Sequence, residues 1–438
     1  MYTYKKHVEL PCQGGMFMRI RLHNAKILTM QEEQIIKGEL WIDNGIIEYI
    51  GEETSSEKKF QREIDLHGNL VMPGLKNAHA HSPMTFARSC ADDLPLDKWL
   101  NEKIFPMEAK LTKKHIYYYS KLAYMEYLSS GITAAFDMYC MPDVISKASI
   151  ETGFRTVLCG EINNFTESIE NLDAYYTYYN NQDELISYIL GFHAEYTTDL
   201  PILKQLGKLA EKHQSPVYAH NSETEREVAN CIAKYGMTPT KLFSECGLFD
   251  YGGGGFHCIY LSEEDMDIFK EKGLYAVLNV GSNMKLASGF VHANKYHKAG
   301  IKMAIGTDGA SSNNALDMFR EMYILTVLQK VLEQNAAALR AFDTLKMATV
   351  GSAHAMGLKG CDVLAEGKKA DLIVLDLKAP NMQPENNLIN NLVYAGGKQN
   401  VCMTMINGKI LYENGEYKTI DAEEVYYYGN KLLKELHD

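Results

Sequence analysis

Two histidines one residue apart, His79 and His81, end the apolar run MPGLKNAHAHSPM at residues 72–84. Side chains alternate between the two faces of a strand, so both rings point the same way. Along the strand they stand roughly 6–7 Å apart, and two imidazoles at that spacing can bind one metal ion. A single histidine of this kind is commonly structural, but the pair indicates a metal site.

Ionisable side chains also follow several later apolar runs. They are His193 in GFHAEY, His220 and Glu223 in VYAHNSE, His257 in GFHC and Asp308 in IGTDGASSNN. Neutral imidazoles with one carboxylate suit zinc or ferrous iron, whereas calcium and magnesium take more oxygen ligands. Zinc lowers the pKa of a bound water from about 15.7 to about 7. We therefore expect one divalent transition metal, zinc or alternatively ferrous iron, in a hydrolytic site.

Two of the segments after these runs allow a structural as well as a chemical interpretation. SETE resembles a capping box formed by Ser222 and Glu225, which would leave Glu223 free to pass a proton to a ring nitrogen of a substrate. In SSNNALDMFREM, Ser312 and Asn313 either cap the following helix or contact the substrate.

The middle of the chain, residues 73–360, alternates apolar runs with helix-like segments such as LPILKQLGKLAEKHQ. With a strand at residues 70–79, the runs predict eight strands: GITAAFDMY, FRTVLCGEI, YILGFHAEY, SPVYAHN, GGFHCIYL, LYAVLNVGS and IKMAIGTD. Eight strand–helix alternations predict an α/β fold, a (β/α)8 TIM barrel. The active site of such a barrel lies at the carboxyl ends of its strands, where the candidate residues fall.

Both ends of the chain are rich in short strands. RIRLHNAKILTM and GELWIDNGIIEYIG lie near the start, and KADLIVLDL and VCMTMINGKILYENGEY lie near the end, with Asn-Gly turns at Asn407-Gly408 and Asn414-Gly415. We expect both termini to build one small β-sandwich domain, residues 1–72 with 361–438, beside the barrel of residues 73–360.

Composition narrows the classes of partner and compartment. The chain has 438 residues, 46% of them hydrophobic, and a net charge of −12, which disfavours binding to nucleic acid phosphates. We find no membrane span and, in MYTYKKHVELPCQGG, no apolar region of a secretion signal. Nine scattered cysteines suit a reducing cytoplasm. We expect a cytoplasmic protein with a small-molecule substrate. It could be a homo-oligomer, and the tyrosine-rich LDAYYTYYN is either a contact surface or a helix packed on the barrel.

Several motifs resemble the amidohydrolase superfamily, within it the branch that holds 5-methylthioadenosine/S-adenosylhomocysteine deaminases and triazine hydrolases. They are PGLKNAHAHSPMTFARSCADDLPLDKWLNEKIFPMEAKLT, GFHAEYTT, HNSETEREV, FHCIYLSEEDM, GTDGASSNNALDMFREM and KKADLIVLDL. The resemblance implies a single metal held by His79, His81, His220 and Asp308. It also implies that Glu223 and His257 handle protons and orient the water, and that Asp308 takes a proton from it. SYILGFHAEY lacks the lysine that bridges two metals in binuclear relatives.

The resemblance also implies substrate contacts. Glu108 is expected to bind ribose hydroxyls, His193 to contact the substrate and Trp99 to pack beside it. The alternatives are a solvated helix position for Glu108 and core or lid packing for Trp99.

Two stretches depart from the family pattern, and the first bears on specificity while the second alters the wall beside the metal. The arginines that bind the amino-acid carboxylate of S-adenosylhomocysteine are missing from FRTVLCGEINNFTESIENL, where Arg155 lies inside the strand and the loop offers Glu161 and Glu167. Where the family often has His-Asn-Pro, this chain has Leu278-Asn279-Val280.

We therefore expect a hydrolytic deaminase of adenine nucleosides, in which metal-bound hydroxide attacks the amino-bearing ring carbon. Methylthioadenosine, 5′-deoxyadenosine or adenosine fit better than S-adenosylhomocysteine. The alternatives are a guanine-type or triazine aminohydrolase or chlorohydrolase on the same metal, and a metal-free scaffold protein.

Overall fold

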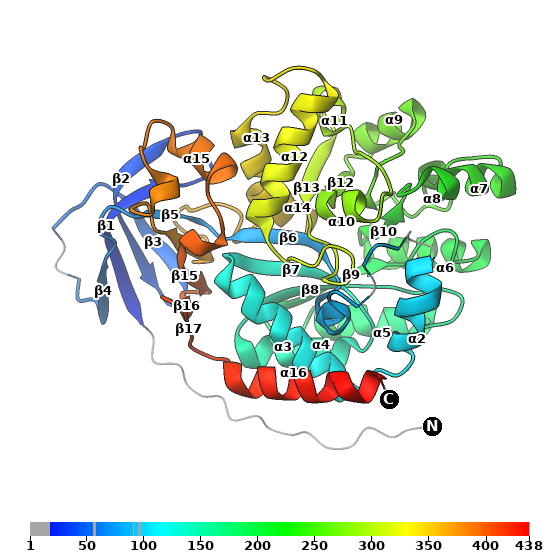
Figure 1. Ribbon diagram of the computed structural model, residues 1–438, viewed down its shortest axis with the longest axis horizontal. Coiled ribbons are helices and arrows are strands. Elements are labelled where there is room, and N and C mark those ends of the chain that lie inside the picture. Colours follow the sequence, from blue (N-terminus) through cyan, green and yellow to red (C-terminus); the bar gives the residue numbers. More distant parts are fainter. Residues whose placement is uncertain (1–17, 56–57, 91, 95–97, 438) are drawn as a thin grey trace.

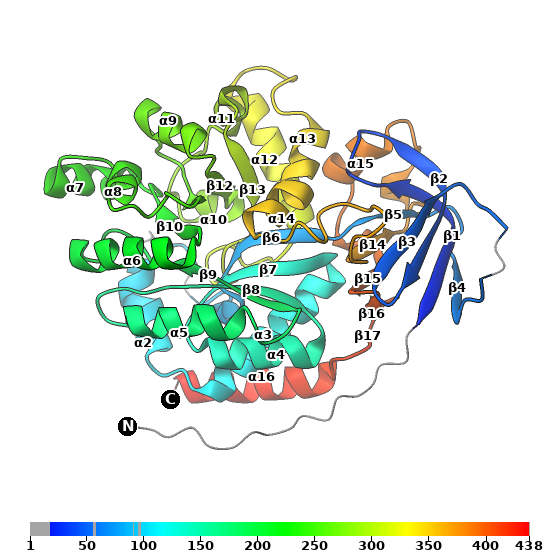
Figure 2. The same ribbon diagram turned by 180° about the vertical axis from the view of Figure 1, so that it is seen from behind.

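The computed structural model describes residues 18–437, apart from 56–57, 91 and 95–97. Its centre is a sheet of eight parallel strands in which each strand pairs with the next along the chain. The strands are β6 (Leu75–Ala80), β7 (Ile132–Met138), β8 (Arg155–Cys159), β9 (Ile186–Gly191), β10 (Val217–Asn221), β11 (Gly253–His257), β12 (Tyr275–Leu278) and β13 (Lys302–Ile305). Figures 1 and 2 show helices around this sheet. The predicted (β/α)8 barrel is confirmed.

The first and last strands of the barrel, β6 and β13, meet next to the predicted metal ligands His79 and Asp308. The Thr307 N–H donates to Asn77 Oδ1 (2.8 Å) and the Asp308 N–H donates to the His79 carbonyl (3.0 Å). The approach is so close that a Cβ atom on Gly306 would lie 2.6 Å from the His79 nitrogen. Closure of the barrel therefore sets His79 beside Asp308.

The predicted strand at residues 70–79 is wrong as a single element. It is two strands, β5 (Leu70–Pro73) and β6, separated at Gly74. β5 pairs with strands of the terminal sheet, and the Gly74 N–H donates to the Asp371 carbonyl (3.1 Å). A Cβ atom on Gly74 would lie 2.2 Å from the Thr133 side chain, so only glycine allows this crossing between the two sheets.

Helices follow the barrel strands. The α-helices before the terminal segment are α2 (Phe105–Glu108), α3 (Lys113–Ser129), α4 (Pro142–Thr152), α5 (Ile169–Tyr179), α6 (Leu200–His213), α7 (Glu225–Tyr235), α8 (Pro239–Glu245), α9 (Glu263–Glu271), α10 (Val280–Lys285), α11 (Ala293–Ala299), α12 (Met318–Leu332), α13 (Ala341–Lys346) and α14 (Ser352–Ala355). Shorter or wider turns form η1 (Ser82–Ala87), the π-helix η2 (Trp99–Ile104) and the π-helix η3 (Met347–Gly351). The predicted helices at LPILKQLGKLAEKHQ and LSEEDMDIFKEKG are α6 and α9.

A second sheet is built from both ends of the chain, as predicted. Its order is β17-β16-β15-β14-β5-β1-β2-β3, with β4 paired to β1. The remaining strands are β1 (Arg19–Leu28), β2 (Ile35–Asp43), β3 (Ile46–Gly51), β4 (Arg62–Asp65), β14 (Leu372–Leu375), β15 (Val401–Ile406), β16 (Lys409–Glu413) and β17 (Glu416–Tyr417). The predicted Asn-Gly turns join β15 to β16 and β16 to β17, with positive φ angles of 48° and 71°, then 49° and 89°. These are the angles that favour Asn-Gly in two-residue hairpins.

The last helix of the chain lies on the barrel. The terminal segment carries η4 (Pro380–Met382), α15 (Leu388–Tyr394), η5 (Lys398–Asn400) and α16 (Ala422–His437). The α16 helix runs along α3, where the Tyr118 hydroxyl donates to Glu424 (2.9 Å) and the Tyr119 hydroxyl donates to the Gly429 carbonyl (3.1 Å) (Figure 1). The division into residues 1–72 with 361–438 and residues 73–360 stays a prediction, and α16 forms contacts across it.

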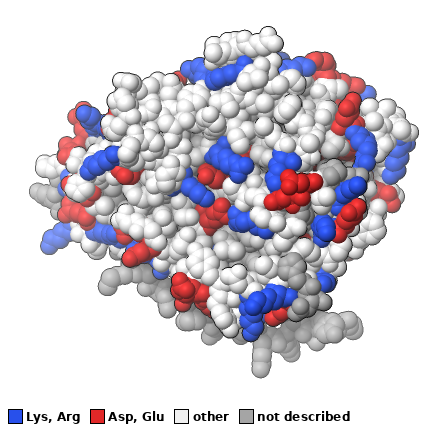
Figure 3. Space-filling model, in the orientation of Figure 1, with Lys and Arg blue, Asp and Glu red and all other residues white. Residues whose placement is uncertain are grey.

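The structure bears on the expectations about membrane spans, cysteines and surface charge. None of the helices in the described residues is long and apolar enough to cross a membrane. All cysteines of the described residues are free thiols. The segment MYTYKKHVELPCQGG lies outside the described residues. Basic and acidic side chains are interspersed over the face shown in Figure 3.

A buried ion pair joins the barrel to the terminal sheet. The guanidinium of Arg155, at the start of β8, donates to both carboxylate oxygens of Asp371 (2.8 and 3.1 Å), which precedes β14. Their side chains are 3% and 0% exposed. Burial would raise the pKa of Asp371, but the charge and hydrogen bonds of Arg155 outweigh it, so the pKa lies below its usual value.

We expect Asp371→Ala to lower the free energy of unfolding by about 3–5 kcal/mol, because it leaves a buried guanidinium without its carboxylate. The midpoint of urea unfolding, followed by circular dichroism, measures this. The control is Glu184→Ala, which removes the exposed partner of Lys369 (2.9 Å) and is expected to cost about 0–1 kcal/mol. Equal losses in the two variants would contradict the importance of the buried pair.

Candidate metal centre

The predicted metal ligands come together at the carboxyl ends of the barrel strands. His79 and His81 lie at the end of β6, His220 lies in β10 and Asp308 follows β13. Ligand atoms of His79, His81 and His220 lie within 4.8 Å of one another, as do those of His79, His257 and Asp308. The Asp308 Oδ1 atom lies 3.5 Å from His79 Nε2 and 3.3 Å from His81 Nε2. These residues from distant parts of the chain thus surround one point.

Carbonyl groups of the backbone fix two of the imidazole rings. Nδ1 of His81 lies 2.5 Å from the Met138 carbonyl, and Nδ1 of His220 lies 2.8 Å from the His193 carbonyl. A carbonyl oxygen only accepts hydrogen bonds, so each Nδ1 atom carries the hydrogen. In its neutral form each ring then presents the lone pair of Nε2, the form that binds a metal.

The third ring and the carboxylate complete a set that fits a metal ion. Both ring nitrogens of His79 are buried without a hydrogen-bond partner among the described residues, and the ring stacks on Phe256 at 3.8 Å. Buried polar atoms usually have partners, so these nitrogens indicate a missing ligand. Three imidazoles and one carboxylate are donors that zinc accepts. The residues present therefore fit one divalent transition metal.

Burial and neighbouring charges shift the pKa values of the cluster residues in different directions. Burial, reinforced by neighbouring histidines, lowers the pKa of His79 and His220 well below the usual value, which keeps both rings neutral. Burial also opposes ionisation of Asp308, but His81 and His257 outweigh it and hold its pKa well below the usual value. For His81 the nearby Asp308 outweighs burial and raises the pKa to about 9. The cluster therefore pairs an anionic carboxylate with two neutral rings, His79 and His220, and with a His81 ring that must release its second proton before Nε2 can bind a metal.

Glu223 and His257, the predicted proton-handling residues, flank the ligand set. Glu223 is 5% exposed, and its Oε1 atom accepts a hydrogen bond from Ser288 Oγ (3.0 Å). Its Oε2 atom lies 3.9 Å from His257 Nε2. Burial raises the pKa of Glu223, partly opposed by His257. A carboxyl group with a raised pKa is suited to hold a proton and release it to a substrate.

Two of the site residues have unusual backbone angles. His257 has a φ angle of +69° and Asp308 has a φ angle of +62°, values that residues other than glycine seldom adopt. Such backbone strain tends to occur at functional sites, because the surrounding structure must hold it in place. Here it turns both side chains towards the same point.

The predicted capping box of Ser222 and Glu225 is wrong. Helix α7 is capped two residues later, by Thr224 and Glu227: Thr224 Oγ1 accepts the Glu227 N–H (3.1 Å). The Glu227 carboxylate in turn accepts the N–H groups of Ser222 and Glu223 (2.8 and 2.7 Å). Two overlapping box patterns occur in SETERE, and the turn after β10 decides between them. The Glu223 side chain takes no part in the cap.

The structural role expected for Ser312 and Asn313 also needs correction. Asp317 caps helix α12, accepting the N–H groups of Phe319 and Arg320 (3.0 and 3.3 Å). Ser312 Oγ instead donates to Asp308 Oδ2 (2.8 Å), so this hydroxyl orients the carboxylate. Asn313 donates to the Thr307 carbonyl (2.8 Å) and holds the loop in place. A direct contact of Ser312 with substrate stays a prediction.

Glu108 lies in the site and not on a solvated helix face. It ends α2, is half-buried, and accepts a hydrogen bond from the Tyr139 hydroxyl (2.6 Å). Burial raises its pKa, while Tyr139 and His81 act in the opposite direction. Glu161, directly after β8, faces the same region: burial, followed by the charge of Glu108, raises its pKa to about 8. Two carboxyl groups therefore stand beside the metal ligands.

His193 and Trp99, the other predicted substrate contacts, have different surroundings. His193 Nδ1 lies 2.9 Å from Thr197 Oγ1, and its ring centre lies 4.9 Å from that of His220. Burial, with the charges of His81 and His257, lowers the pKa of His193 to about 4, so the ring is neutral. Trp99 is 5% exposed within the main hydrophobic core, at the start of η2. Its place in the substrate pocket stays a prediction.

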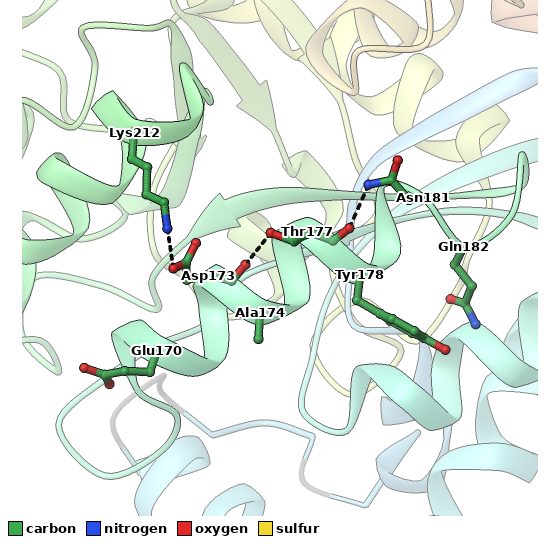
Figure 4. Close-up of a pocket in the computed structure, with 8 residues that line it drawn as sticks. All are labelled: Glu170, Asp173, Ala174, Thr177, Tyr178, Asn181, Gln182 and Lys212. Carbon is green, nitrogen blue, oxygen red and sulfur yellow. Dashed lines mark hydrogen bonds and ion pairs between the residues drawn. The ribbon is translucent and has the colours of Figure 1, made fainter. Parts of the chain in front are cut away.

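Two hollows differ in their relation to the site. A cavity of about 530 Å³ adjoins Glu223 through Ser288 and is lined by η2, the start of α7 and the loops after β9 and β12. The other, about 680 Å³, is a shallow surface hollow on α5, where Lys212 of α6 pairs with Asp173 (Figure 4). It contains part of LDAYYTYYN, which is a helix packed on the barrel with Tyr178 60% exposed.

Sequence patterns did not single out several residues that orient the site. Ser282 Oγ donates to Asp308 Oδ2 (2.6 Å), Ser288 holds Glu223, Asn283 contacts His257 and Tyr139 contacts Glu108. Three of them lie in LNVGSNMKLASG, directly after β12. The available signal was this cluster of small polar side chains at the end of a barrel strand.

Known proteins resemble nearly the whole of this chain. A family model described as the amidohydrolase family matches residues 70–411. The 5-methylthioadenosine/S-adenosylhomocysteine deaminases of Caldicellulosiruptor saccharolyticus and Thermoanaerobacter pseudethanolicus are 39% and 38% identical, over 93% and 96% of this chain and 96% and 99% of theirs. Among solved structures, an adenosine deaminase from Xanthomonas campestris with bound zinc has a TM-score of 0.90 and 30% identity, over 96% of this chain and 98% of that one. Atrazine chlorohydrolase from Arthrobacter aurescens, at 20% identity and a TM-score of 0.88 over 94% of this chain and 100% of its own, shares the fold.

We expect stability to depend on pH through Glu195, a cavity-lining residue that is 3% exposed and has one carboxylate oxygen without a partner among the described residues. Burial, partly opposed by Lys234, raises its pKa to about 7, against about 4.3 for an unfolded glutamate. The contribution of Glu195 to the free energy of unfolding is therefore fully present below the pKa of an unfolded glutamate and is lost as the pH rises towards 7.

The variant Glu195→Gln cannot ionise, so it should gain stability relative to the natural chain as the pH rises. The difference in free energy of unfolding between the variant and the natural chain should rise by about 2 kcal/mol from about pH 5.5 to about pH 8.5. Urea unfolding at both values measures it. Glu225→Gln, at an exposed position on the same cavity, serves as the control and should show little change. A gain for Glu195→Gln that is independent of pH would contradict the assignment.

Proposed function

Because this chain belongs to the amidohydrolase family, we propose that it is a metal-dependent hydrolytic deaminase of adenine nucleosides. The observation that carries the proposal is the convergence of His79, His81, His220 and Asp308 beside a buried carboxyl group, Glu223. The names of its relatives, methylthioadenosine and S-adenosylhomocysteine deaminases and an adenosine deaminase, support the nucleoside.

A divalent metal at this site would determine the type of reaction. Zinc, or alternatively ferrous iron, would be held by the three imidazoles and Asp308, and when bound it lowers the pKa of a coordinated water to about 7. Zinc is favoured by the zinc-containing adenosine deaminase of similar structure. The substrate is a small molecule.

The residues around the metal move the protons. Glu223 protonates the ring nitrogen next to the amino-bearing carbon, which relieves charge as the water oxygen adds to that carbon. His257 holds the attacking water or the oxyanion that develops from it. Asp308 takes a proton from the water and passes it to the departing ammonia. Ser282 and Ser312 hold Asp308 in the orientation that this transfer needs.

Carboxyl groups define the other end of the substrate pocket. In this proposal Glu108 accepts hydrogen bonds from ribose hydroxyls, His193 contacts the substrate, and Trp99 packs beside it. Arg155 is bound to Asp371 at the start of β8 and does not serve the pocket. The loop after β8, residues 160–168, offers Glu161 and Glu167 but no lysine or arginine for a carboxylate on the 5′-substituent, so small neutral substituents are preferred.

We expect ammonia release to be fastest with methylthioadenosine, 5′-deoxyadenosine or adenosine in a panel that also contains S-adenosylhomocysteine, guanine and melamine. The missing charged hydrogen bond, worth about 1.5–3 kcal/mol, lowers kcat/KM for S-adenosylhomocysteine by about 10- to 100-fold. A preference for S-adenosylhomocysteine would refute the 5′-specificity. Reaction of guanine or melamine alone would favour the alternative, a guanine-type or triazine hydrolase. A chain that binds no transition metal, even with zinc supplied, would favour the scaffold alternative.

We expect Glu223→Gln to lower kcat by about 10²- to 10⁴-fold with the zinc content unchanged, because the amide cannot transfer the proton. Activity assays and metal analysis of the purified variant measure the two effects. His220→Ala is the matched comparison and should lose both zinc and activity, because it removes a ligand. Full activity of Glu223→Gln would exclude the proposed proton transfer.

The cytoplasmic location and the association of copies stay predictions. Among the described residues the free cysteines are compatible with a reducing compartment. Size-exclusion chromatography with light scattering measures the oligomeric state directly.

A further inference from the structure

His257 is held from two directions by the segment after β12. Its backbone N–H donates to Asn279 Oδ1 (3.2 Å), and its ring Nδ1 atom lies 2.7 Å from Asn283 Oδ1. Both asparagine residues are 0% exposed, and the His257 residue is 2% exposed. Water therefore does not compete for these contacts, and their geometry determines how the ring is oriented.

The two asparagines act together because they lie one helical turn apart. Asn279 precedes the first residue of α10, and the Asn283 N–H donates to the Asn279 carbonyl (2.9 Å). Residues four apart lie on the same face of a helix. The buried Glu321 of α12 fixes this turn, since it accepts the Gly281 N–H (2.9 Å) and the Asn313 side chain (2.8 Å). Both asparagines are therefore presented to His257 by a rigid turn.

The contact with Asn283 determines which ring nitrogen of His257 carries a hydrogen. An amide oxygen only accepts, so Nδ1 must donate, and a neutral imidazole has a single N–H group. The other nitrogen, Nε2, then carries a lone pair. Nε2 is the atom on the side of the candidate site, 3.9 Å from Glu223 Oε2.

We propose that Asn283 is a positioning residue that sets the tautomer of His257, so that Nε2 accepts a hydrogen bond from the attacking water and does not donate one to an oxyanion. This inference rests on the proposed function and chooses between the two roles that it leaves open for His257. The lone pair of Nε2 aligns the water's O–H group, so the oxygen lone pair points to the substrate.

The direct test is the tautomer itself. Nitrogen-15 NMR of the zinc-loaded protein with labelled histidine distinguishes a neutral ring protonated on Nδ1 from one protonated on Nε2. We expect the His257 signal, identified by its loss in His257→Gln, to be the Nδ1-protonated form. A ring protonated on Nε2 would overturn the proposal. This readout needs no turnover, so it stands even if the substrate class is wrong.

Two substitutions test whether the side chain at position 283 accepts a hydrogen bond from His257 or donates one to it. Asn283→Asp keeps an acceptor of nearly the same volume, whereas Asn283→Leu removes it. We expect Asn283→Leu to lose about 10- to 100-fold in kcat, the usual cost of removing such a partner, with KM nearly unchanged. Asn283→Asp should retain most of the activity, and both should keep their zinc. If the aspartate variant is as impaired as the leucine variant, the amide donates to His257 and the proposal fails.

A remote control identifies losses due to folding alone. Asn400 is 1% exposed, and its side chain accepts the Gly397 N–H (3.0 Å) and the Asn381 amide (2.8 Å), far from the site in the chain. Asn400→Leu makes the same chemical change, and we expect lower stability with kcat unchanged. A loss of kcat in Asn400→Leu equal to that in Asn283→Leu would assign the latter to general destabilisation and overturn the proposal. If the nucleosides are not deaminated at all, the proposed function fails, and the NMR result still decides the tautomer.

Discussion

For two of the three ligand imidazoles, the geometry of the site depends on one constraint: the buried ring hydrogen-bonds to protein through one nitrogen, so that the other nitrogen is free for a ligand. Backbone carbonyls at the ends of neighbouring barrel strands meet this need for His81 and His220. The strand that carries one ligand is thus oriented by the strand beside it. A shift in the pairing of the strands would remove a carbonyl from its ring and leave a buried N–H group without a partner, at a cost of about 1–3 kcal/mol.

The same burial that fixes the rings also sets their charges. Desolvation favours neutral His79 and His220, while the one carboxylate of the set, Asp308, stays ionised because imidazoles surround it. Around this centre, burial raises the pKa of the other carboxyl groups, Glu223, Glu108 and Glu161. Similar side chains therefore take different protonation states, and each state suits a different task in moving protons.

The terminal sheet supports the opposite end of the barrel. The Arg155–Asp371 pair joins the start of β8 to β14, and Gly74 lets one continuous segment cross from the terminal sheet into β6. Because β6 carries His79 and His81, the terminal sheet fixes the start of the strand that supplies two ligands. The terminal domain is in this sense part of the scaffold of the site.

The sequence by itself determined those features that depend on short periods along the chain. The spacing of His79 and His81, the alternation of strands with helices, the strand-end positions of His220, Glu223, His257 and Asp308, and the Asn-Gly turns are all local patterns, and strand pairing then places them at one end of a barrel. Contacts between distant segments were decided only by the tertiary structure. Sequence gave no reason for Asn283 to meet His257, or for Glu161 to lie near Glu108, because such pairs depend on strand order and barrel closure. The break at Gly74 and the true caps, Thr224 and Asp317, were missed for a related reason. Several local conformations were compatible with the residues, and packing against the rest of the chain selected one of them.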